Sequence, residues 1–109
     1  MKLSERELEE INPRMQPMGF EAASAFQDEL PEWAISDDLE REYQFRDFRE
    51  AMVFVNKVAD LANDADHHPE IEIKYNRVEI ELVTHLIGGL SINDFIMAAK
   101  IDEIYEAMK

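Results

Sequence analysis

Residues 70–83 read EIEIKYNRVEIELV, and this stretch decides the fold. Apolar side chains alternate with charged ones on both sides of Asn76-Arg77, and a period of two residues is typical of a half-buried β-strand. We take Asn76-Arg77 as a two-residue hairpin turn. That turn places Ile71 opposite Leu82 and keeps every apolar side chain on one face, as a sheet with a single buried face requires. The stretch therefore predicts an antiparallel hairpin.

The same register predicts that the histidines of the chain meet. Extended beyond the hairpin, it places His68 opposite His85, and directly opposed residues have Cβ atoms about 4.5–5.5 Å apart. His67 is adjacent in sequence, so all three histidines of the chain are expected at one end of the sheet. Tyr75 lies on the apolar face in this register and is expected in the core.

Two long helices flank the hairpin in the sequence. Residues 47–63 repeat apolar side chains at steps of three and four, and Asp47 is suited to cap the N-terminus of that helix. A second side of this helix is also partly apolar, which suggests contact with another subunit. Ser91 is expected to cap a last helix that extends to about residue 107.

The residues before the first long helix predict a second hairpin and two short helices. Apolar and charged residues alternate around the turn signal at 36–38, so residues 33–45 are expected to form the hairpin. Ser4-Glu5-Arg6-Glu7 has the form of a capping box, which predicts a helix that ends before Pro13. A second short helix is expected over residues 20–30.

These elements predict an α+β fold in the order α(α)ββαββα. Two hairpins form a four-stranded antiparallel sheet with helices packed on one face. We expect one compact domain, divided into an N-terminal helical extension over residues 1–30 and the sheet-forming part over residues 31–109.

Composition excludes several classes of function. Aspartate and glutamate number 25 against 11 lysines and arginines, and a net charge of −14 argues against binding to nucleic acids or anionic membranes. The absence of cysteine excludes disulfides and thiolate chemistry. The first ten residues contain no apolar segment of the kind found in signal peptides, and no stretch is long enough to span a bilayer. A cytoplasmic protein is expected.

Three interpretations of the histidine cluster remain open at this point. The histidines could be ordinary surface and turn residues. They could hold a metal ion, although their spacing matches no standard zinc motif. They could also perform general acid–base chemistry without a metal, because imidazole exchanges protons near neutral pH.

The motifs around the histidines resemble those of the pterin-4a-carbinolamine dehydratase family, with matching spacing across residues 66–94. The motif residues are DHHP (66–69), YNRV (75–78), TH (84–85), GLS (89–91) and Asp94. Residues 45–59 are similar to the first long helix of the family, and Trp33 matches the tryptophan of its first strand. The resemblance covers about residues 31–108, whereas the first 30 residues match poorly.

The resemblance implies the dehydration of 4a-hydroxytetrahydropterin to quinonoid dihydropterin, a step that regenerates the pterin cofactor of aromatic amino acid hydroxylases. It implies no metal and no organic cofactor, since the pterin is the substrate, and it implies a homodimer or homotetramer. The family's catalytic histidines correspond to His67, His68 and His85. We expect His67 and His85 to transfer protons at the hydroxyl group, and His68 to orient the pterin or assist proton removal.

The expected substrate-binding residues are Asp66, Pro69, Asp94 and Asn63. Each also has a structural interpretation: Asp66 and Pro69 can shape the turn, and Asp94 can stabilise the N-terminus of the last helix.

The chain departs from the family at two positions, since Asn63 replaces a usual acid and Ile71 a usual aromatic residue. These departures keep open the alternative of a non-catalytic interaction module on the same fold. An unrelated metal-dependent hydrolase is a third possible class.

Overall fold

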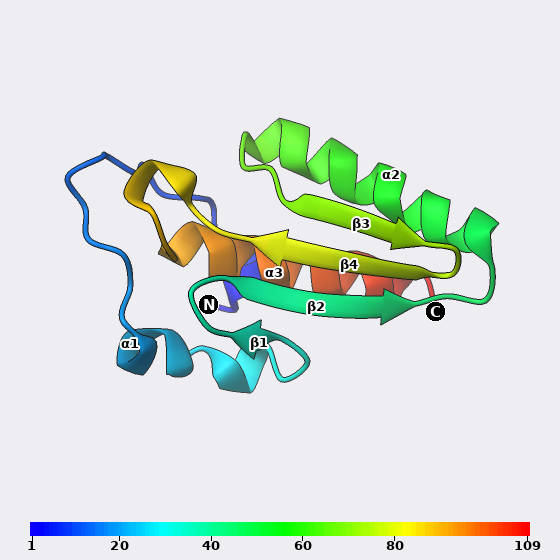
Figure 1. Ribbon diagram of the computed structural model, residues 1–109, viewed down its shortest axis with the longest axis horizontal. Coiled ribbons are helices and arrows are strands. Elements are labelled where there is room, and N and C mark those ends of the chain that lie inside the picture. Colours follow the sequence, from blue (N-terminus) through cyan, green and yellow to red (C-terminus); the bar gives the residue numbers. More distant parts are fainter.

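The sheet carries its two long helices on a single face (Figure 1). The computed structural model describes all 109 residues. Its four strands are antiparallel and lie in the order β1-β2-β4-β3. The strands are β1 (Ala34–Ile35), β2 (Leu39–Gln44), β3 (Glu70–Lys74) and β4 (Arg77–Leu82). The α-helices are α1 (Phe20–Ser24), α2 (Phe48–Ala65) and α3 (Ile92–Ala107), and the 3₁₀ helices are η1 (Leu3–Glu5), η2 (Gln27–Glu29) and η3 (His85–Ile87).

The core lies between the sheet and the two long helices. Every second residue of β4 is fully buried, and α2 and α3 bury their facing side chains against them. The buried residues of β4 are Val78, Ile80 and Leu82. None of the helices is long and apolar enough to cross a membrane. The predicted α+β architecture, with helices on one face of a four-stranded antiparallel sheet, is confirmed.

The two long helices begin at the predicted residues. The Asp47 carboxylate accepts a hydrogen bond of 2.8 Å from the backbone N–H of Glu50, which caps α2. Ser91 and Asp94 form a reciprocal capping box at the start of α3. Helix α2 extends to Ala65 and ends where Asp66 adopts a left-handed conformation with φ of 53°.

The predicted register of the β3–β4 hairpin is wrong by two residues. The turn consists of Tyr75 and Asn76, so Ile71 pairs with Ile80 and not with Leu82. Asn76 fixes this register, because its carbonyl accepts a hydrogen bond of 2.8 Å from the N–H of Phe45 and its amide donates to the Phe45 carbonyl. A slip of two residues leaves each side chain on its face, so the alternating pattern cannot detect it.

Two further predictions are wrong because of that register. Tyr75 has a φ of 54° in the turn and is 67% exposed, so it does not belong to the core. The ladder ends at Glu70, and His85 lies in η3 beyond the end of β4, so His68 does not pair with His85.

The N-terminal residues form less helix than predicted. The helix expected from Ser4 to before Pro13 is reduced to the single turn η1, and that expected over residues 20–30 divides into α1 and η2. Contacts with α3 explain the first difference: the Ser4 hydroxyl donates to Glu103, and the Ser4 carbonyl accepts a 2.9 Å hydrogen bond from Lys100. The groups that would close a local helix are therefore used in tertiary contacts.

A half-buried carboxylate joins α3 to the first two strands. Asp102 accepts hydrogen bonds from the Trp33 indole (3.0 Å), from Arg41 (2.7 Å) and from the Tyr43 hydroxyl. Burial, reinforced by the negative charge of Asp102, raises the pKa of Tyr43 well above its ordinary value. Because the Tyr43 hydroxyl stays protonated, it remains a donor to Asp102.

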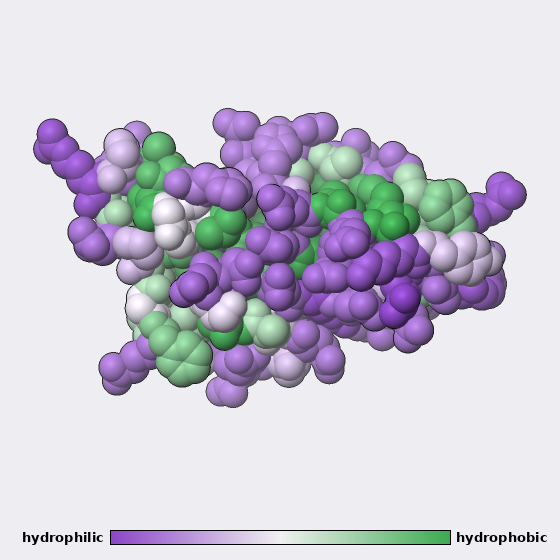
Figure 2. Space-filling model, viewed as in Figure 1, coloured by the Kyte–Doolittle hydropathy of each residue, from purple (hydrophilic) through white to green (hydrophobic).

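The face of the sheet opposite the helices is open and acidic, and Figure 2 shows it as largely hydrophilic over β2 and β4. Paired glutamates form two rows across β2, β4 and β3. The rows are Glu40, Glu81 and Glu70, and Glu42, Glu79 and Glu72. This face accounts for part of the negative charge of the chain.

Candidate active site

All three histidines line one cavity of about 650 Å³ at the end of the fold where η3 and the α2–β3 junction meet. They reach it without the strand pairing that the sequence analysis assumed. His67 and His68 lie in the segment between α2 and β3, and His85 is the first residue of η3. Asp66 also lines this cavity, whereas Asn63, Pro69 and Asp94 are not part of its lining.

His67 is held by a buried carboxylate. Its Nε2 lies 2.7 Å from Oδ1 of Asp94, which is fully buried, while the His67 side chain is 13% exposed. The left-handed turn at Asp66 redirects the chain after α2, and the backbone N–H of His67 donates to the Ala62 carbonyl at 3.2 Å. The end of α2 and the start of α3 therefore fix the His67 ring together.

The second carboxylate oxygen of Asp94 is equally engaged. Oδ2 accepts hydrogen bonds from the Thr84 hydroxyl at 2.8 Å and from the Ser91 N–H at 2.9 Å. The hydroxyl groups of Thr84 and Ser91 lie 2.7 Å apart and complete this buried network. Asp94 therefore caps α3 and contacts His67 at the same time.

His68 and His85 differ in their surroundings. Nε2 of His68 lies 3.0 Å from the side-chain oxygen of Asn63, one turn back on α2. The His85 ring is exposed and makes no hydrogen bond within the chain. The loop after His85 is closed by the bridge between Thr84 and Gly89, which places His85 at the rim of the cavity.

One wall of this cavity was not predicted from the sequence. Residues 8–11 line it, although all other lining residues come from residue 65 or later in the sequence. The buried Asn93 lines it from the first turn of α3. Nothing local in residues 8–11 predicts this position, because tertiary contacts hold them there. Asn93 precedes Asp94 at the capped start of α3, and that position is a signal that could have drawn attention to it.

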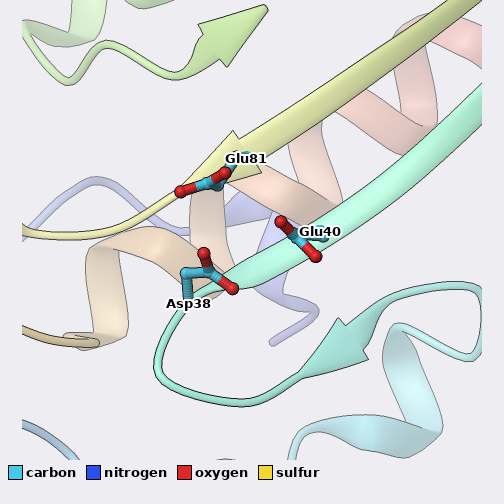
Figure 3. Close-up of side chains that lie close together, drawn as sticks. All are labelled: Asp38, Glu40 and Glu81. Carbon is cyan, nitrogen blue, oxygen red and sulfur yellow. The ribbon is translucent and has the colours of Figure 1, made fainter.

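A separate cluster of acidic side chains has the spacing of a metal site. Single carboxylate oxygens of Asp38, Glu40 and Glu81 all lie within 4.8 Å of one another on the open face of the sheet (Figure 3). A hydrogen bond with Asp38, followed by burial and the charges of neighbouring acids, raises the pKa of Glu81 to about 7. The histidines form no cluster with this spacing.

The fold and the cavity define a small α+β protein with a histidine and carboxylate site suited to proton transfer. The sequence model of the pterin 4 alpha carbinolamine dehydratase family matches residues 16–104. The chain therefore belongs to the pterin-4a-carbinolamine dehydratase family, whose chemistry is that of a lyase.

Relatives and a solved structure support this assignment. A protein of Rubrobacter xylanophilus that carries the family name is 39% identical over 105 residues, covering 94% of this chain and 98% of the relative. A protein of the same family name from Thermomicrobium roseum is 51% identical over 77 residues, or 70% of this chain and 83% of the relative. The crystal structure of a transcriptional coactivator/pterin dehydratase from Brucella melitensis has a TM-score of 0.77 and 30% identity, covering 82% of this chain and 98% of that one.

Proposed function

We propose that this chain dehydrates 4a-hydroxytetrahydropterins to quinonoid dihydropterins by histidine acid–base catalysis, within the recycling of a pterin cofactor. The observation that carries the proposal is the cavity lined by all three histidines, one of them held by a buried carboxylate. In the reaction the C4a–O bond breaks, the hydroxyl group leaves as water after receiving a proton, and a ring N–H loses one. The balance needs no oxidant or reductant.

His67 is suited to move a proton at Nδ1. When Nε2 carries a proton and donates it in a hydrogen bond to Asp94, Nδ1 is left free to accept or return a proton. A carboxylate that accepts from one ring nitrogen also fixes the tautomer and the orientation of the ring. Asp94 is therefore a positioning residue in this mechanism, since its carboxylate does not reach the cavity.

His85 is the natural partner of His67 at the hydroxyl group. Its ring is exposed to the cavity and bound to nothing else in the chain, so both nitrogens are available to a substrate. His68 is oriented by Asn63 and is suited to bind the pterin or to assist removal of the ring proton. Proton transfers of this kind contribute about 10²–10⁴-fold to a rate.

The proposed mechanism uses no metal and no organic cofactor. Its proton donors and acceptors all come from the chain, and the pterin enters as the substrate. The spacing of the histidine nitrogens supports this choice, because they do not converge on one point as the ligands of a metal ion do.

A coupled assay on freshly generated 4a-hydroxytetrahydropterin tests the proposal. We expect the purified protein to accelerate dehydration, and the double variant His67→Ala/His85→Ala to lose most of that activity while keeping its circular dichroism spectrum. Wild-type turnover in the double variant would overturn the histidine mechanism. An uncatalysed rate in the wild type would overturn the function.

A second candidate function is an interaction module on the same fold. The solved structure from Brucella melitensis is also titled a transcriptional coactivator, and α2 of this chain leaves Phe48 and Val53 48% and 45% exposed. Exposed apolar side chains on a helix favour contact with another protein or with a second copy of the chain. We propose a homodimer or homotetramer for contact with a second copy of the chain. Light scattering on purified protein tests this, because it distinguishes such an oligomer from a monomer.

A further inference from the structure

The N-terminal segment forms a wall of the proposed active site. Leu8, Glu9, Glu10 and Ile11 line the same cavity as the histidines, although more than 50 residues separate them from His67 in the sequence. Figure 1 shows the N-terminal trace beside the segment that carries η3. The cavity is therefore closed on this side by residues that precede the whole sheet.

Specific hydrogen bonds hold this segment in place. The side chain of Asn93 accepts a bond of 2.7 Å from the Glu9 N–H and donates one of 2.8 Å to the Glu9 carbonyl. Asn93 is 4% exposed and directly precedes Asp94, so the first turn of α3 positions both the wall and His67.

Further along, the segment is fastened to the loop that follows η3. The N–H of Met18 donates to the Leu90 carbonyl at 2.7 Å, and the Pro17 ring packs on Gly89. Residues 8–18 are thus anchored at both ends to elements that carry site residues. A wall held in this way can position a substrate-binding group.

The two carboxylates of this wall are not equivalent. The Glu9 carboxylate is 2.9 Å from Arg6 and is committed to that ion pair. The Glu10 side chain makes no hydrogen bond and no ion pair within the chain, and no lysine or arginine lines the cavity. Glu10 is therefore an uncommitted acceptor at the proposed substrate site.

We propose that Glu10 recognises the pyrimidinone edge of the pterin by accepting hydrogen bonds from its 2-amino group and its N3–H. These are two adjacent N–H donors, and a carboxylate can accept both through its two oxygens. The amino group is on the ring carbon opposite C4a, so its recognition does not compete with the histidines for the reacting hydroxyl group. The inference rests on the proposed function, because it assumes that a pterin occupies the cavity.

The variant Glu10→Gln tests this role with little change of shape. We expect a rise of about 10- to 100-fold in KM and in the dissociation constant of a stable tetrahydropterin, with kcat almost unchanged. The matched control is Glu7→Gln, the same change on the same exposed segment but outside the histidine cavity. The control should bind pterin like the wild type.

A second ligand shows whether the contact is to the pyrimidinone edge. Lumazine has an oxygen in place of the 2-amino group, so the wild type should bind pterin more tightly than lumazine, and Glu10→Gln should lose that preference. If both variants are active and Glu10→Gln binds pterin as tightly as Glu7→Gln does, the role of Glu10 is overturned and the proposed function stays intact. A wild type that neither binds pterin nor accelerates dehydration would instead overturn the proposed function, and with it the inference.

Discussion

The substitution Asp94→Asn removes the negative charge that contacts His67 and keeps the shape of the side chain. Oδ2 of Asp94 accepts from two donors, Thr84 and the Ser91 N–H, so the asparagine oxygen must take that position. Its NH₂ group then faces Nε2 of His67, which forces Nε2 to accept and puts the ring proton on Nδ1. The variant therefore reverses the tautomer of His67 without moving the ring.

The bonds of Asp94 set the expected loss of stability and the expected loss of activity. Hydrogen bonds to charged groups contribute about 1.5–3 kcal/mol each and neutral ones about 1 kcal/mol. All three bonds of Asp94 become neutral, so the free energy of unfolding should fall by about 2–3 kcal/mol. A His67 that cannot accept at Nδ1 loses its part in proton transfer, so kcat should fall by about 10²-fold or more. KM should change little, because Asp94 does not line the cavity.

The assays are steady-state kinetics, thermal unfolding and ¹⁵N NMR of the imidazole rings. NMR should show the proton of neutral His67 on Nε2 in the wild type and on Nδ1 in the variant. Asp64→Asn is the matched control, because Asp64 is exposed on α2 and does not line the histidine cavity. A folded Asp94→Asn variant with the kcat of the wild type would refute the argument.

Three further predictions concern the stability of the fold. The raised pKa of Glu81 means that, between about pH 4.5 and about pH 7, the folded state binds a proton that the unfolded state has released. The free energy of unfolding should therefore fall as the pH rises through this range. Glu81→Gln should raise the melting temperature at pH 8 but not at pH 4. A Cβ at Gly89 would lie 2.6 Å from Cβ of Pro17, so Gly89→Ala should cost about 1–3 kcal/mol in denaturant unfolding, and adding Pro17→Gly should recover part of it. Asp102→Ala leaves a half-buried arginine and two buried donors without their acceptor and should cost about 3–5 kcal/mol, whereas unchanged stability would contradict the role given to that cluster.

Local rules predicted the elements of this fold where the sequence carries both a period and a cap. The starts of α2 and α3 follow from Asp47 and Ser91, since each supplies the side-chain oxygen that the first helical N–H groups need. The layer order then follows from alternation in the strands, because only one face of the sheet is apolar. Neither step requires a long-range contact.

Register and the N-terminal segment could not be predicted in the same way. The hairpin register depends on bonds between Asn76 and Phe45, which belong to different hairpins of the chain. The path of residues 4–11 depends on Lys100 and Asn93 of α3, more than 80 residues away. Propensity favours a helix there, and tertiary hydrogen bonds override it.

Asp94 shows why capping and a role at the site should not be weighed as exclusive alternatives. Its two oxygens have separate roles. Oδ2 accepts a hydrogen bond from the N–H of Ser91 and so caps α3, while Oδ1 contacts Nε2 of His67. An acid at the third position of a helix is placed there by the needs of the helix terminus. Because the same buried carboxylate orients the imidazole, any motion that frays the first turn of α3 also releases His67. The stability of this helix terminus and the orientation of His67 are therefore coupled, because both depend on the carboxylate of Asp94.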